Sequence, residues 1–152
     1  MRTLFMILLA FLIQAGMSQT GTSSLMKEIP FGSHAYLQVD DIGNDILVHI
    51  LAVEKYDKDL DPSKTAVLFE KIPEPGTIEL YFGKGKDGGP FKSILLIRNN
   101  AKKTIEFQGQ ASDPGQGATG ARAMELRPGV ISSELWNEEL KGIILSGFKV
   151  KE

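Results

Sequence analysis

Hydrophobic residues occupy both sets of alternate positions in one stretch of the chain, residues 45–56 (DILVHILAVEKY). One set carries Ile46, Val48, Ile50 and Ala52, and the other carries Leu47, Leu51 and Val53. Because side chains of a strand alternate between two faces, a stretch that is apolar on both predicts a strand covered on both sides. We therefore expect residues 45–56 to form the central strand of the fold.

We expect the other strands to be apolar on one face only, and residues 34–40, 77–82 and 103–108 show this alternation clearly. The strands expected beside the central one are residues 34–40, 65–72, 77–82, 91–98, 103–108 and 143–151. Glycine, proline and asparagine separate many of these stretches, as expected for turns. The three strands between residues 77 and 108 follow one another closely, which predicts an antiparallel meander.

One stretch, residues 133–141 (SELWNEELK), has a helical pattern. Ser133 is a suitable N-cap, Gly142 follows the last turn, and Trp136 and Leu140 lie four residues apart on one face. With about seven or eight strands and this short C-terminal helix, the sequence predicts a mostly β fold. We expect an antiparallel β-sandwich of the immunoglobulin-like or jelly-roll-like kind.

The first 18 of the 152 residues have the order of a secretory signal peptide. Arg2 precedes a ten-residue apolar run, residues 4–13, and small residues follow up to Ser18. Ten apolar residues fall short of the roughly 20 that span a bilayer. We therefore predict cleavage after Ser18, a flexible lead-in over residues 19–33 and a single domain over residues 34–152. The mature protein would be secreted or periplasmic and without a membrane span.

Composition narrows the functions that such an exported domain can have. The chain contains no cysteine, which removes thiol catalysis, a lipoprotein anchor and disulfide bonds. The domain must then be stabilised by its core, and its size is sufficient for that. The net charge is −2, and it becomes −3 when the signal peptide with Arg2 is removed. This balance argues against nucleic acid as a partner.

The catalytic motifs that sequence can identify are missing. Neither G-x-S-x-G nor H-E-x-x-H occurs. Two G-x-G-x-x-G matches, at residues 83–88 and 115–120, lack the following helix that would hold a phosphate, so they predict loops. Of the two histidines, His49 lies in the predicted central strand and is expected to be structural. His34 begins a strand and could serve a hydrolase that also uses carboxylates.

Two long glycine-rich loops, residues 83–90 and 109–120, are the most promising functional segments, since long loops on a rigid scaffold often carry binding sites. The candidate binding residues are Lys84, Lys86, Asp87, Asp113, Gln116, Thr119 and Arg122. We expect a non-enzymatic binding protein, for instance an inhibitor or immunity protein. Its partner would be a protein or glycan outside the cytoplasm.

Calcium is the one cofactor that the sequence leaves open. Asp57, Asp59 and Asp61 place three carboxylates two residues apart, a spacing that can converge on one calcium ion. The pattern then departs from a calcium loop, because Pro62 stands where a turn glycine is needed and Leu68 stands at the twelfth position. Two alternatives to the binding protein follow: a secreted structural or matrix protein with a calcium-linked acidic loop, and a carboxylate-dependent hydrolase that uses His34.

Overall fold

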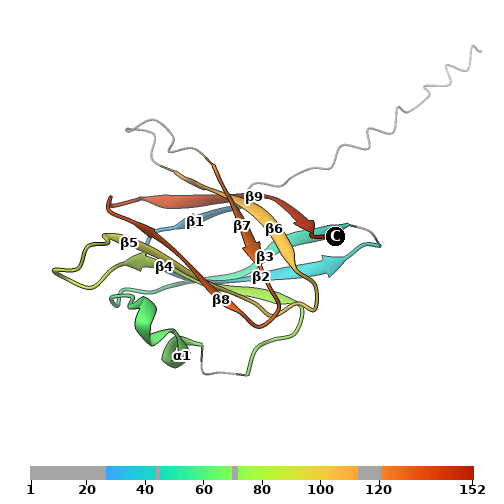
Figure 1. The fold of residues 1–152 in the computed structure, drawn as a ribbon, viewed down its shortest axis with the longest axis horizontal. Coiled ribbons are helices and arrows are strands. Elements are labelled where there is room, and N and C mark those ends of the chain that lie inside the picture. The colour runs from blue at the N-terminus through green and yellow to red at the C-terminus, as the bar shows by residue number, and fades with distance from the viewer. Residues whose placement is uncertain (1–26, 44, 70–71, 113–120) are drawn as a thin grey trace, which may run out of the picture.

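The computed structural model describes residues 27–43, 45–69, 72–112 and 121–152. The predicted signal peptide, 1–18, and residues 19–26 lie outside them. In the described residues, nine strands form two antiparallel sheets that pack face to face (Figure 1). The predicted β-sandwich is therefore confirmed.

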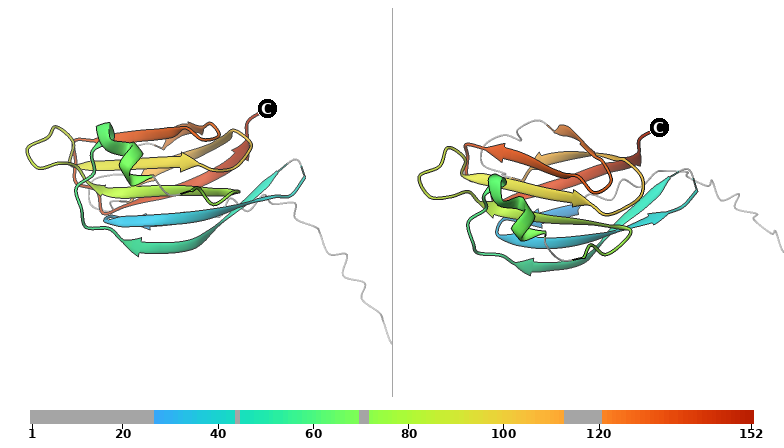
Figure 2. Two further views of the ribbon diagram at one scale, coloured as in Figure 1. Left: turned by 90° about the horizontal axis from the view of Figure 1, so that it is seen from below. Right: turned by 60° about the horizontal axis from the view of Figure 1, so that its bottom comes forward.

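The four-stranded sheet has the order β1 (Lys27–Pro30), β9 (Gly142–Val150), β6 (Ile105–Ala111) and β7 (Arg122–Leu126). The five-stranded sheet has the order β3 (Ile46–Lys55), β2 (Ser33–Asp41), β4 (Thr77–Lys84), β5 (Ser93–Asn99) and β8 (Ile131–Trp136). A 3-10 turn, Pro62–Lys64, leads into α1 (Thr65–Leu68), which lies across the outer face of the five-stranded sheet (Figure 2).

Strands β4 and β5 are buried on both faces. Leu95 and Ile97 of β5 face the core between the sheets, and neither is exposed. On the other face, Ile94 and Leu96 pack in a second cluster with Phe69, which follows α1. Residues in the middle of the five-stranded sheet thus have two apolar neighbourhoods, one between the sheets and one beneath the α1 segment.

The prediction that residues 45–56 form the central strand is wrong, because β3 lies at the edge of its sheet. Ile46 and Val48 reach the core between the sheets. Four other large apolar side chains remain 37–53% exposed: Leu47, Ile50, Leu51 and Val53. Apolar residues on both faces indicate that a strand could be covered on both sides, but the pattern does not identify which neighbours cover it.

Two secondary-structure predictions are wrong: a predicted helix is a strand, and a predicted strand begins as a helix. Residues predicted as the C-terminal helix form β8 instead, in which Trp136 pairs with Ser93 of β5. A nine-residue helix is marginal by itself, so pairing with a buried strand decides the conformation. The predicted strand 65–72 begins as α1, because Asp61 caps the preceding 3-10 turn and accepts a hydrogen bond from the Ser63 backbone nitrogen at 2.9 Å.

The predicted meander is also interrupted, since β6 belongs to the four-stranded sheet. The chain leaves β5 at Asn99, whose buried side chain donates hydrogen bonds to the carbonyl oxygens of Lys103 and Leu126 at 2.8 and 2.9 Å. Its side-chain oxygen accepts a bond from the Ala101 nitrogen at 2.9 Å. These bonds stabilise the corner that carries the chain from one sheet to the other.

The domain begins earlier than predicted. Within the expected lead-in, residues 27–30 form β1, which pairs with β9 from Lys27 opposite Leu145 to Pro30 opposite Gly142. Ile29 is fully buried in the core between the sheets. A single buried side chain in a four-residue strand gives too little periodicity to be recognised in the sequence.

Truncation of β5 on either face tests this two-sided burial. Leu95→Ala and Leu96→Ala should each lower the free energy of unfolding by about 2–5 kcal/mol, because each leaves a cavity in a packed cluster. Val67→Ala on the exposed face of α1 is the control and should change it by no more than about 0.5 kcal/mol. Urea denaturation measures all three. If Leu96→Ala costs no more than the control, the outer face is not packed as described.

Candidate functional site

Several connections meet at one end of the sandwich, at the left in Figure 1. The backbone nitrogen of Lys92, just before β5, bonds to the Trp136 carbonyl at the end of β8 at 2.9 Å. The Phe31 nitrogen bonds to the Lys141 carbonyl at the same distance. We call this region, formed by Phe31 and residues 84–92 and 137–141, the loop end.

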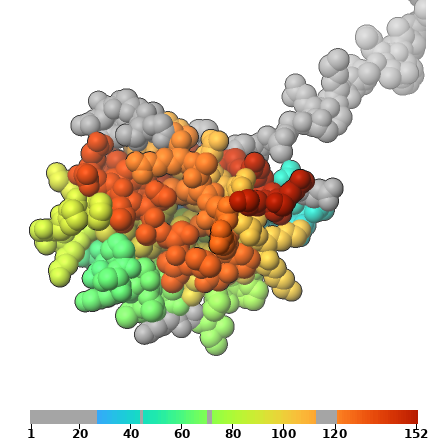
Figure 3. All heavy atoms as spheres, in the orientation of Figure 1, coloured from blue at the N-terminus to red at the C-terminus, as the bar shows by residue number. Residues whose placement is uncertain are grey.

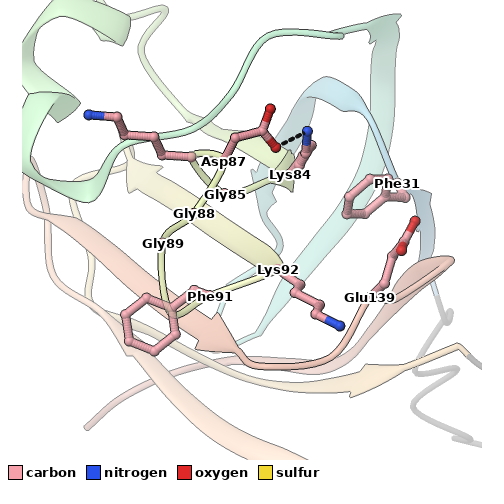
Figure 4. A pocket seen from close by; sticks show the side chains of 10 residues that line it. Phe31, Lys84, Gly85, Asp87, Gly88, Gly89, Phe91, Lys92 and Glu139 are labelled. Carbon is pink, nitrogen blue, oxygen red and sulfur yellow. Dashed lines mark ion pairs between the residues drawn. The ribbon is translucent and has the colours of Figure 1, made fainter.

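A pocket of about 320 Å³ opens at the loop end (Figure 4). Three segments that are distant in the sequence form its wall: Phe31 between β1 and β2, the loop from Lys84 to Lys92, and Glu139 before β9. The ring of Phe31 and the side chains of Lys92 and Glu139 lie around the open space in Figure 4. In Figure 3 the loop from Lys84 to Lys92 lies at the margin of the molecule, beside the acidic segment that precedes α1.

Backbone contacts hold the loop from Lys84 to Lys92 in place. A Cβ atom on Gly85 would lie 2.2 Å from the Phe91 carbonyl oxygen, so this position requires glycine. The Gly89 nitrogen donates to the Lys86 carbonyl at 2.9 Å and closes a turn in which Gly88 has a φ of 77°. The glycines therefore serve the tight geometry of the loop, and the side chains between them are presented to solvent.

The lysines of the loop end differ in whether they form ion pairs. Lys84 forms an ion pair with Asp87 and lies 4.0 Å from Asp59. The hydrogen bond to Asp87 raises the pKa of Lys84 above its ordinary value. Within the described residues, Lys86 and Lys92 are in no ion pair, and both are exposed. Both ammonium groups are exposed to solvent, and Lys86 lies near enough to Asp61 for its charge to contribute to the lowered pKa of that carboxyl.

The structure brings together part of the predicted binding set. Lys84, Lys86 and Asp87 all line the pocket. Arg122, the first residue of β7, lies near the same end, with its guanidinium 6.0 Å from the centre of the Trp136 ring. The remaining three predicted residues lie outside the described residues: Asp113, Gln116 and Thr119.

Four pocket residues outside the predicted loops were missed in the sequence: Phe31, Phe91, Lys92 and Glu139. Phe31 lies in the stretch interpreted as a lead-in, and Glu139 lies in the stretch interpreted as a helix. Phe91 and Lys92 lie in the stretch interpreted as a strand, residues 91–98. No local pattern marks these positions, because the pocket depends on how three separate segments meet.

The three aspartates of the acidic loop have different neighbours. Asp57 lies 4.0 Å from Lys55, and Asp59 lies 4.0 Å from Lys84. Asp61 accepts bonds from Ser63, which lower the pKa of Asp61. In the described part of the chain, no three metal-ligating side chains converge.

Calcium binding by the acidic loop stays a prediction. If the loop binds calcium, titration calorimetry should show heat of binding, and a thermal melt should show a higher Tm at millimolar calcium. Neither would appear if the loop binds no calcium.

Apart from the loop end, a network of polar side chains lies beneath the α1 segment, around the buried carboxylate of Glu79 on β4. Tyr36, Glu79 and Arg98 occupy directly opposed positions on β2, β4 and β5. Arg98 donates to Glu79 Oε2 at 2.6 Å and to the Phe69 carbonyl at 2.7 Å. The hydroxyl of Tyr36 donates to Glu79 Oε1 at 3.2 Å. The network therefore ties three neighbouring strands to the segment that covers them.

His34 joins this network. Its Nε2 lies 3.0 Å from Glu79 Oε1, its Nδ1 lies 4.0 Å from Glu54, and its ring stacks on Tyr81 with centroids 4.0 Å apart. His34 thus lies beside two carboxylates, the exposed Glu54 and the buried Glu79. Both Glu79 oxygens already have hydrogen-bond partners, which favours a structural role for the network, and hydrolysis stays a prediction.

The pKa of Glu79 links this network to stability. Burial alone would raise the pKa, but hydrogen bonds from His34 and Arg98 and the charge of Arg98 outweigh it and hold the pKa below its ordinary value of 4.5. A carboxyl whose pKa is lower in the folded state stabilises the protein above the unfolded pKa. This contribution is lost as the pH falls through the folded pKa.

Replacement of Glu79 should therefore have a pH-dependent cost. Glu79→Gln leaves Arg98 buried without its anion and should lower the free energy of unfolding by about 3–5 kcal/mol at neutral pH. The difference from the unchanged protein should begin to shrink as the pH falls below about 4.5, where the unfolded carboxyl becomes protonated, and should be smallest below the lower pKa of the folded carboxyl. Urea denaturation across this range measures it, with the exposed Glu54→Gln as control. A difference that is constant with pH would contradict the ion pair.

Comparison with known proteins does not place this chain in a family. No family model matches the sequence, and neither curated proteins nor solved structures give a match. Within the residues that the structure describes, no helix has the length and hydropathy needed to cross a membrane. The function of the loop end must therefore be argued from its own residues.

Proposed function

We propose that this chain is an exported, non-enzymatic binding protein that engages a protein or glycan outside the cytoplasm through its loop end. The observation that carries the proposal is the pocket at the loop end, where Phe31, Lys92 and Glu139 come together from three separate segments. An inhibitor or immunity protein is one form that such a protein would take.

The support beneath the loop favours binding. The loop connects β4 and β5, whose residues are buried except Lys84 at the end of β4. A ligand that contacts the loop would therefore meet a largely preformed surface, and less conformational entropy would be lost on binding. Loops that a rigid scaffold positions in this way are common binding sites.

The chemistry of the pocket favours a partner with both apolar and anionic groups. Phe31 and Phe91 supply apolar surface, and Lys86 and Lys92 supply cations that are in no ion pair with described residues. Glu139 adds an acceptor for hydroxyl or amino groups of the partner. A carboxylate-bearing protein loop or an acidic glycan has these features.

Charge reversal at the pocket tests the proposal. Lys86→Glu combined with Lys92→Glu should reduce partner capture from the extracellular or envelope fraction at least about tenfold, because like charges in an interface cost several kcal/mol. The matched control is Lys102→Glu, an exposed lysine between β5 and β6 at the opposite end of the sandwich. Affinity capture with quantitative mass spectrometry measures recovery. Equal recovery by both variants would refute the assignment to the loop end.

A further inference from the structure

The outer edge of β3 has no strand beside it in the described part of the chain. β3 is ten residues long, and its pairing with β2 on the inner side runs from Ile46 to Lys55. The backbone N–H and C=O groups that point away from β2 form a template for a further strand. This edge is separate from the loop end and from the function proposed for it.

The side chains along this edge are unusual for one that faces water. Leu47, Ile50, Leu51 and Val53 are between 37 and 53% exposed. Natural edge strands are usually protected by lysine, proline, inward-pointing charges or a bulge. Residues 46–53 contain no lysine, proline or acidic residue. The one irregularity in the pairing of β3 with β2 is a bulge at Leu51, which has no residue opposite it because Tyr36 pairs with Ala52 and Leu37 pairs with Ile50.

The middle of β3 has a symmetric order of side chains, Leu47-Val48-His49-Ile50-Leu51. Leucine stands at both ends, a β-branched residue follows from either end, and His49 is at the centre. Leu51 lines a hollow with Tyr36 and Glu79 on the outer face of the sheet, and His49 lies 3.3 Å from Asp40. Val48 instead faces the core between the sheets.

An antiparallel pair related by a two-fold axis brings each strand against its own reversed order. If the axis passes through His49, Leu47 lies opposite Leu51 of the second copy, and Val48 lies opposite Ile50 of the second copy. Residues that lie opposite each other then belong to the same face, as an antiparallel ladder requires. Asp40 of each copy accompanies the His49 side chain at the axis.

We propose that β3 is a homodimer interface, in which the edges of two copies pair antiparallel about a two-fold axis at His49. This pairing satisfies both unpaired edges and covers Leu47 and Leu51 from each copy at once. A second copy is the occupant that the side chains favour, because it presents leucine to leucine and β-branched residue to β-branched residue in one register. The charged residues Glu54 and Lys55 lie beyond this segment, and His49, which has Asp40 beside it, is the one ionisable residue within it.

Paired charge substitutions test both the interface and its register. Leu47→Glu alone and Leu51→Lys alone should each raise the dimer dissociation constant at least about tenfold, since each places a charge against leucine. The double substitution should recover affinity, because the carboxylate introduced at position 47 then faces the ammonium introduced at position 51 of the other copy. Val67→Glu on α1 is the matched control and should not change association. Sedimentation equilibrium measures each constant, and circular dichroism confirms that each variant is folded.

The absence of cysteine permits a second, independent readout. His49→Cys should give a covalent dimer under mild oxidation, because directly opposed residues of an antiparallel pair have Cβ atoms about 4.5–5.5 Å apart. Val67→Cys should not. The proposal is overturned if the unchanged protein is monomeric at submillimolar concentration, if the double substitution associates no better than either single one, or if crosslinking shows no preference for position 49.

Discussion

Burial of β4 and β5 on both faces is the constraint on which the rest of the structure depends. Their inner face needs the four-stranded sheet, and their outer face needs the α1 segment, because apolar surface left in water costs roughly 25 cal/mol per Å². Covering the outer face also buries Glu79 and Arg98, whose charges then require each other and the Phe69 carbonyl. The polar network and the covering segment are therefore consequences of one packing arrangement.

The same constraint shapes the loop end. The loop from Lys84 to Lys92 connects two strands that are fixed by packing on both sides, so its own residues need not contribute to the core. Glycine at position 85 allows the backbone to approach Phe91, and the turn exposes Lys86. A surface built in this way can carry charge and apolar groups that would be costly elsewhere, which is the physical basis of the function proposed for it.

Unlike β4 and β5, strand β3 lies at the edge of the five-stranded sheet. It contributes Ile46 and Val48 to the core, yet Leu47, Ile50, Leu51 and Val53 remain partly exposed. Residues suited to two-sided burial at a sheet margin are consistent with a partner that completes the burial. The proposed dimer would account for the strength of the apolar pattern in β3, whereas the central position that the pattern predicts belongs to β4 and β5.

The alternation of apolar residues and the turn residues between them predicted the fold class and placed most strands, because both signals are local. The sequence also identified the loop that contains Lys84, Lys86 and Asp87. Tertiary structure decided which strand is central, that the stretch ending in Trp136 is a strand, and that Phe31 and Glu139 meet at one pocket. These features depend on contacts between residues far apart in the chain, and periodicity records the number of apolar faces but not the neighbours that cover them.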